Sequence, residues 1–136
     1  MVILYDRFNL PDNIYDILFA TEQQAIVAKL LVDMMRKNNN EVGRELMSFF
    51  ANKLHDGKFV MDANDERLKS LNLPSGKKTI VSYNKRQFYD RILTPLKGMG
   101  LIEFDIYKKV YHLSNHFLKD LNEISKLWQI ELMKKK

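Results

Sequence analysis

Apolar residues recur at helical spacing through most of the chain, and short extended stretches separate the helical ones. Near the start, Val2–Phe8 reads as a short strand and Pro11–Phe19 as the beginning of a helix. The first clear helix opens at Thr21 with a capping box, in which the side chain of Gln24 can reach back to the Thr21 amide. This helix ends at the asparagines 38–40, because asparagine side chains compete for the backbone in a helix interior.

The middle of the chain alternates between helical and extended patterns. A second apolar stripe predicts a helix from Glu41 to His55 with Asn40 as its N-cap, and Gly57 ends it as a left-handed residue. Residues 58–61 read as an extended run, and a small helix carrying Leu68 and Leu71 precedes the break at residues 74–76. Residues 77–81 then form a basic connection.

A third helix is predicted from about Lys85 to Met99, capped by Ser82 or Asn84. Its apolar residues fall together on one face that we expect to be buried: Phe88, Ile92, Leu96 and Met99. Pro95 removes one backbone donor, so it either kinks this helix or starts a new last turn with Thr94 as cap. Gly100 allows the positive φ that ends the helix.

The last third of the chain predicts a hairpin and one more helix. Leu101–Ile106 and Lys109–Leu113 read as antiparallel strands, because few residues separate them. A final helix follows Ser114 or Asn115, with apolar residues at four-three-four spacing: Phe117, Leu121, Ile124 and Trp128. The pattern as a whole predicts a mainly helical α+β domain spanning residues 1–136.

Composition narrows the class of protein. The chain has 136 residues and 46% hydrophobic content, which suffices for one core. It has no cysteine, so disulfides, thiol catalysis and cysteine-based zinc fingers are excluded. No apolar run approaches the roughly 20 residues that a membrane span needs, and the N-terminus lacks the pattern of a signal peptide. We therefore expect a cytoplasmic protein without membrane contact.

The net charge of +5 is concentrated in one short segment. Residues 77–97 hold one acid, Asp90, and six bases: Lys77, Lys78, Lys85, Arg86, Arg91 and Lys97. The remaining 16 basic and 16 acidic residues cancel. Such a segment is either a solvated basic face or a site for an anionic partner such as nucleic acid, and its place in the fold decides between them.

The stretch from Phe88 to Ile102 carries a resemblance to a known family. Its helix ends in a leucine, Leu96, and turns through Gly100, Leu101 and Ile102 into a hairpin. Together with the order of elements from Glu41 to Leu113, this resembles the winged helix-turn-helix family, whose order is H1-S1-H2-H3-S2-wing-S3. The resemblance implies a winged-helix core at about 41–114, an N-terminal helical extension at 1–40 and a C-terminal helix at 115–136. The link from 73 to 82 is longer than the family's usual turn between H2 and H3.

The resemblance implies binding of double-stranded DNA, with helix 84–99 in the major groove and the wing at 105–109 on the backbone. Arg86 and Gln87 suit base edges, since arginine pairs with guanine and glutamine with adenine. Asp90 is expected either to face a base amine or to pair with Arg86. The expected DNA-binding residues are Lys77, Lys78, Ser82, Tyr83, Asn84, Lys85, Arg86, Gln87, Asp90, Arg91, Lys108 and Lys109.

Two functional interpretations follow from the resemblance. The first is a sequence-specific transcriptional regulator, and the second is a winged-helix module of a protein assembly, such as a replication or partition complex, with secondary DNA binding. By analogy with the family, the C-terminal helix is expected to form a homodimer through Phe117, Leu121, Ile124 and Trp128; the alternative is that it folds back on its own core. No residue marks an effector site.

Other chemistries are not indicated. His112 falls on a strand and His116 in a helix, so their spacing of four is no metal-binding pattern. Ser75-Gly76-Lys77-Lys78 lacks the complete phosphate-loop motif. No catalytic set of residues is recognisable, and we expect neither an enzyme nor a cofactor.

Overall fold

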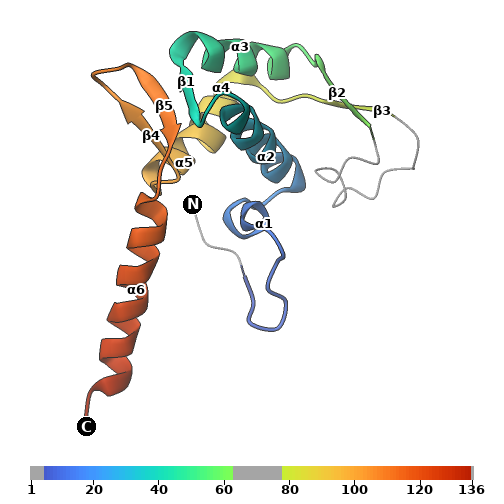
Figure 1. Cartoon of the computed structure of the whole chain (residues 1–136). Coiled ribbons are helices and arrows are strands. Elements are labelled where there is room, and N and C mark those ends of the chain that lie inside the picture. Colours follow the sequence, from blue (N-terminus) through green and yellow to red (C-terminus); the bar gives the residue numbers. More distant parts are fainter. Residues whose placement is uncertain (1–4, 63–77, 136) are drawn as a thin grey trace.

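The computed structural model describes residues 5–62 and 78–135. Helix α2, Glu22–Lys37, lies at the centre of the body (Figure 1). The Thr21 half of the predicted capping box is confirmed, because the Thr21 hydroxyl accepts a hydrogen bond from the Gln24 amide at 3.2 Å. The Gln24 side-chain nitrogen lies 3.4 Å from the Tyr83 hydroxyl. Half of the sixteen residues of α2 are buried, and they surround most of its circumference. The helix therefore packs against several elements, which include α1, Ile14–Leu18, and an edge strand and the central strand of the sheet described below.

A short strand follows α2 where the sequence predicted the start of a helix. Asn39 and Asn40 adopt left-handed conformations with φ of 60° and 65°, and strand β1, Glu41–Gly43, begins directly after them. The expected helix Glu41–His55 is therefore wrong at its first turn, and Gly43, rather than Asn40, is the N-cap of α3, Arg44–His55. The physical reason is tertiary, because β1 pairs with a distant strand and buries Val42.

The predicted hairpin is confirmed as β4, Ile102–Asp105, and β5, Val110–Leu113. These antiparallel strands and β1 form a three-stranded sheet in the order β1-β5-β4. A second pair, β2, Phe59–Asp62, and β3, Lys78–Val81, is a separate antiparallel ribbon on the other side of the body (Figure 1). The small helix expected around Leu68 and Leu71, and the residue Lys77, lie outside the described residues.

The third predicted helix is continuous but changes its pitch. It begins as α4, Lys85–Phe88, widens to a π-helical turn, η2, Tyr89–Leu93, and ends as α5, Thr94–Gly98. In a regular α-helix the Pro95 ring would collide with the carbonyl of the residue four positions earlier. The wide turn just before the proline, in which the Thr94 amide bonds back to the Tyr89 carbonyl, lets the helix continue.

The C-terminal helix α6, His116–Met133, projects away from the body (Figure 1). Its first turn is fastened at Gly100, whose carbonyl accepts a hydrogen bond from the Phe117 amide at 3.1 Å. No residue of α6 is buried.

The observed elements confirm the expected α+β class. Across residues 5–62 and 78–135, every helix falls short of the length or the apolar character that crossing a bilayer requires.

Gly100 is expected to tolerate no side chain. Its φ is +80°, and a Cβ atom there would lie 2.8 Å from the Cβ of His116 and 3.0 Å from the Phe117 amide nitrogen. Gly100→Ala should therefore lower the free energy of unfolding by about 2 kcal/mol or more, through left-handed strain and the displacement of α6. Urea unfolding followed by circular dichroism measures this.

Gly98→Ala is the matched control, because nothing lies within 4 Å of a Cβ atom at Gly98. This substitution at the end of α5 should leave stability unchanged or raise it by about 0.5 kcal/mol. Equal unfolding free energies for the two variants would contradict the account of Gly100.

Candidate nucleic-acid interface

The start of α4 is held in place by three polar contacts. Asn84 is its N-cap, and the Asn84 side-chain oxygen accepts a hydrogen bond from the Gln87 amide at 3.1 Å. The Lys85 amide donates to Nδ1 of His55 at 3.2 Å, and the Tyr83 amide donates to the Leu54 carbonyl at 3.1 Å. The last turn of α3 thus fixes where the candidate helix begins.

The two faces of the candidate helix differ completely in exposure. Phe88, Ile92 and Leu96 are fully buried, as the sequence predicted, and the wide turn adds Leu93 to the core. The outward face carries four of the expected DNA-binding residues, all of them exposed: Arg86, Gln87, Asp90 and Arg91. The structure therefore brings these four together on one solvent-facing surface, which we call the outer face.

Asp90 pairs with Arg86 one helical turn before it. The Arg86 Nε atom lies 3.8 Å from the Asp90 Oδ2 atom, and the two side chains are 91% and 66% exposed. An exposed ion pair at i,i+4 spacing contributes only about 0.3–0.5 kcal/mol, so a stronger partner can displace it. The pairing is one of the two geometries expected for Asp90.

Tyr83 does not belong to the outer face, and its assignment to DNA binding is wrong. It is buried with 7% of its surface exposed, and its hydroxyl oxygen lies 3.4 Å from Nε2 of Gln24 on α2. The helical projection misplaced it because Tyr83 precedes the helix and follows extended backbone. Its neighbour Ser82 is exposed, and the Ser82 carbonyl accepts a hydrogen bond from Gln23 at 2.7 Å.

The lysines of the predicted set fall into three groups. Lys85 is half-buried, and its ammonium lies 3.5 Å from the Ser48 hydroxyl of α3, so it turns away from the outer face. Lys78 begins β3 opposite Asp62, on the separate ribbon. Lys108 and Lys109 are exposed at the hairpin tip. The basic segment of the sequence is thus divided in space.

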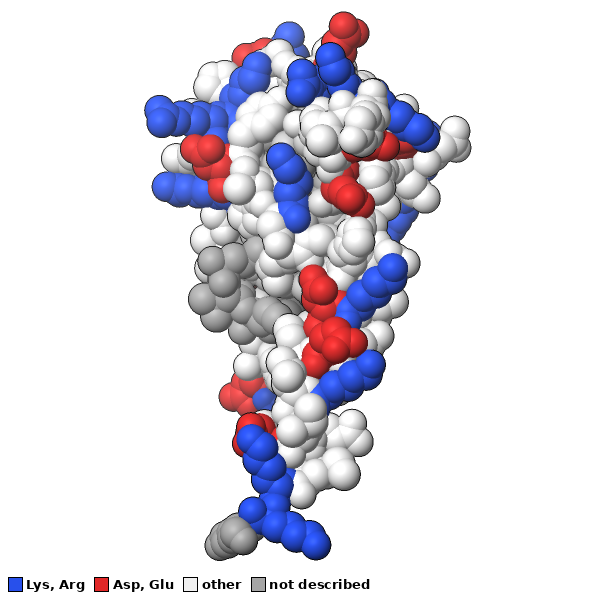
Figure 2. Space-filling view, turned by 90° about the vertical axis from the view of Figure 1, so that its left-hand side faces the viewer, with Lys and Arg blue, Asp and Glu red and all other residues white. Residues whose placement is uncertain are grey.

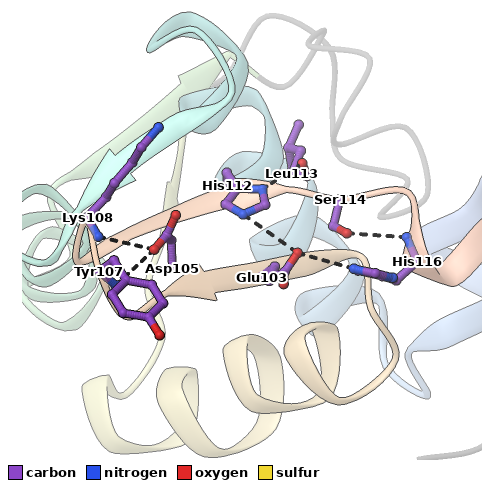
Figure 3. Close-up of polar contacts among 8 residues, drawn as sticks. All are labelled: Glu103, Asp105, Tyr107, Lys108, His112, Leu113, Ser114 and His116. Atoms are coloured by element: carbon purple, nitrogen blue, oxygen red, sulfur yellow. Dashed lines mark hydrogen bonds and ion pairs between the residues drawn. The ribbon is translucent and has the colours of Figure 1, made fainter.

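A carboxylate organises the hairpin tip (Figure 3). Asp105 accepts hydrogen bonds from the backbone amides of Tyr107 at 2.9 Å and Lys108 at 3.1 Å. The bonds from Lys108 and Tyr107 lower the pKa of the Asp105 carboxyl below its ordinary value. Lys109 takes a left-handed conformation with φ of 56°, and Tyr107 is 93% exposed. The tip is therefore an ordered turn that presents two lysines and a tyrosine to solvent.

Two cations join the hairpin to the helices beneath it. The Arg44 guanidinium carbon lies 5.0 Å from the ring centre of Phe104, and the Lys97 ammonium lies 5.8 Å from that of Tyr111. The two rings pack 4.7 Å apart, centre to centre. Sequence reasoning missed Arg44 because its segment was assigned to a helix interior; the signal was Gly43, directly before it.

A second polar cluster links the hairpin to α6 (Figure 3). One carboxylate oxygen of Glu103 lies 3.7 Å from Nε2 of His112 and 3.4 Å from Nε2 of His116. The strand and the helix therefore bring together two histidines that the sequence spacing alone did not connect. No group of three or more acidic, histidine or cysteine side chains among the described residues can hold a metal ion.

The surface charge on the hairpin side is mixed rather than uniformly positive. Figure 2 shows Lys and Arg side chains over the body with Asp and Glu side chains among them, and both signs again along α6. Any recognition by this surface depends on which side chains project, not on a single basic field.

Comparisons with protein-family models, with curated protein sequences and with solved structures find no match to this chain.

The tip should depend on the Oδ1 atom of Asp105, which accepts both amide hydrogen bonds. Asp105→Ala removes this acceptor, so the amides of Tyr107 and Lys108 should exchange with solvent at least severalfold faster in hydrogen-exchange NMR. Asp105→Asn, which keeps Oδ1 but loses the negative charge, should fall between Asp105→Ala and the wild type. Unchanged exchange in Asp105→Ala would contradict this role.

The stabilisation of the tip by the Asp105 carboxylate should decrease only at low pH. Because the Asp105 pKa is lowered, its stabilising effect is fully present above the ordinary carboxyl value of 3.8 and is lost as the pH falls through the lower folded-state value. Protection of the Tyr107 and Lys108 amides, corrected for intrinsic exchange, should therefore be constant from pH 7 down to pH 5. A loss of protection within that range would contradict the assignment.

Proposed function

We propose that this chain is a winged helix-turn-helix protein that binds double-stranded DNA with the α4–α5 helix in the major groove. The element order α2, β1, α3, α4–α5, β4, β5 agrees with the order H1-S1-H2-H3-S2-S3 of the family. This alignment begins one helix earlier than the one the sequence suggested, and it makes β1 the family's first strand. The β2–β3 ribbon is then an insertion between the second and third helices, which accounts for the long link noted in the sequence.

The observation that carries the proposal is the outer face itself. A helix whose opposite side is fully buried presents Arg86, Gln87 and Arg91 to solvent, and no element within residues 5–62 and 78–135 covers them. Arginine and glutamine offer the paired donors and acceptors that distinguish base pairs in the major groove. A π-helical turn within the same helix adds support, since such turns are frequent at functional sites.

The hairpin tip supplies the second contact of the proposed complex. Lys108 and Lys109 project from an ordered turn and suit backbone phosphates, which give affinity without sequence information. We propose that the protein acts as a sequence-specific regulator of transcription, because its base-reading and phosphate-binding groups sit on separate elements. A module of a replication or partition assembly is the alternative, and the sequence dependence of binding separates the two.

We also propose that the active form is a homodimer joined through α6. The exposed stripe of this helix includes Ile124 and Trp128, which are 56% and 64% exposed in the single chain. Large apolar side chains in one contiguous exposed stripe mark an interaction surface. Two joined copies would also engage two half-sites on one duplex, as dimeric helix-turn-helix proteins do.

The first test is duplex binding by fluorescence anisotropy at low and raised salt. Wild-type protein should bind, and its affinity should fall steeply with salt because phosphate contacts release counterions. Arg86→Ala with Gln87→Ala should weaken binding to a selected site by about 1–3 kcal/mol for each lost base contact and should relax its sequence preference. The absence of wild-type binding at low salt would refute the proposal.

A second pair of variants separates the tip from the helix. Lys108→Ala with Lys109→Ala should weaken binding equally on all duplexes and should reduce the salt slope by about two. Lys126→Ala on α6 removes one charge far from the proposed interface and is the control that should leave affinity unchanged. A loss in this single-charge control about half as large as the loss in the double tip variant would show that only net charge matters.

A further inference from the structure

Helix α6 exposes many large apolar side chains. Seven of its large apolar side chains are more than half exposed: Leu118, Ile124, Leu127, Trp128, Ile130, Leu132 and Met133. Phe117, at its start, is partly buried against the body core, and the rest of the helix extends beyond it (Figure 1). Most helix stability in proteins comes from the packing of an apolar face, so this exposed face favours a partner.

We propose that two copies of this chain pair through α6 in antiparallel orientation. The inference deepens the proposed homodimer and rests on it for the choice of partner. It adds a direction, a register and an ion pair between the copies, all of which follow from the distribution of side chains around the helix.

The apolar stripe of α6 has two unlike flanks. At about 100° per residue, its centre is formed by Phe117, Leu121, Ile124, Trp128 and Leu132. One flank carries the charged residues Asp120, Glu131 and Lys134, with Leu127 among them. The other flank carries uncharged residues: Leu118, Asn122, Ser125 and Gln129. Figure 2 shows the charged side chains of this helix beside a white, uncharged surface.

The unlike flanks decide the orientation. In a parallel pair the charged flank of one helix meets the uncharged flank of the other, so Asp120 and Lys134 have no charged partner across the seam. In an antiparallel pair like flanks meet, and their sequence runs in opposite directions. Asp120, near the start of one helix, then lies beside Lys134, near the end of the other. Because the pair of helices is two-fold symmetric, the contact between Asp120 and Lys134 of the second copy forms twice.

This orientation sets a register. A two-fold axis level with Lys126 places Ile124 against Trp128 of the second copy on both sides of the centre. On the two flanks, measured along the axis, Asp120 then lies within about 3 Å of Lys134 of the second copy, and Leu118 lies within about 3 Å of Leu132. Lys134 already contacts Glu131 of its own helix, with Nζ 2.7 Å from Oε1. In the pair, the Lys134 ammonium therefore lies between two carboxylates of opposite chains.

The available surface matches what a stable pair needs. Five of the exposed side chains lie on or beside the stripe, and burying each withdraws on the order of 100 Å² from water. With Phe117, Leu121 and the stems of the flanking charged residues, the stripe approaches the roughly 800 Å² per partner of a standard interface. Ile130 and Met133 lie outside the seam, and their substitution is not expected to affect pairing.

The ion pair is tested by charge exchange in the full chain, with dimer dissociation followed by sedimentation. Asp120→Lys and Lys134→Asp should each weaken the dimer by about tenfold, because each creates two like-charge contacts. The double variant should recover most of this loss. Lys126→Glu, on the outer side of α6, should have no effect. A monomeric wild type, or a double variant as weak as the singles, would overturn the proposal.

Direction is tested by cross-linking, because the chain has no cysteine of its own. A disulfide requires Cα atoms about 4.4–6.8 Å apart. The Leu118→Cys variant and the Leu132→Cys variant should form a mixed disulfide when the two are combined and oxidised. Neither variant alone should form a disulfide-linked dimer. Leu121→Cys should stay unlinked, since the two copies of Leu121 lie roughly 15 Å apart along the antiparallel axis. Self-linking of Leu121→Cys would indicate a parallel pair and overturn the proposal.

These outcomes are independent of DNA binding. A chain that binds duplex DNA but sediments as a monomer would overturn the antiparallel pair and leave the proposed interface standing. A chain that forms the mixed disulfide but does not bind DNA would support the pair and refute the proposed function.

Discussion

The burial of Phe88, Ile92 and Leu96 is the constraint on which the rest of the structure depends. These three side chains are fully withdrawn from solvent, and together they fix the rotation of the α4–α5 helix against α2 and α3. Truncating a buried residue of this size typically lowers stability by about 2–5 kcal/mol, so alternative rotations are strongly disfavoured. The solvent-facing position of Arg86, Gln87 and Arg91 is a direct consequence, because they occupy the remaining side of the same helix.

Gly100 is the point at which the hairpin and α6 are attached to the α4–α5 helix. The chain ends α5, starts β4 and receives the first turn of α6 within a few residues, and the space at Gly100 leaves no room for a side chain. The tip lysines, the outer face and the projecting helix are therefore held by one junction. In the proposed complex, the outer face and the tip contact DNA, and α6 contacts a second copy.

The helices with a strong local pattern could be predicted from the sequence, and the elements that depend on distant partners could not. The cap at Thr21, the buried face of the third helix and the hairpin all follow from local patterns. Strand β1 was missed because Glu41–Gly43 becomes a strand only by pairing with β5. Tyr83 was misplaced because its burial depends on contacts with α2. Of the candidate site, the exposed charges of the helix and tip were predictable, whereas the supporting roles of Arg44 and Lys97 require the tertiary structure.

We propose that the outer face of α4–α5 and the hairpin tip together contact duplex DNA. The decisive experiment is a titration of isotope-labelled protein with duplex DNA at low salt, followed by amide NMR spectra. Shifts should concentrate at residues 84–97 and 105–110, with little change in the distal half of α6. Shifts confined to α2 or to the β2–β3 ribbon, or no shifts at all, would contradict it.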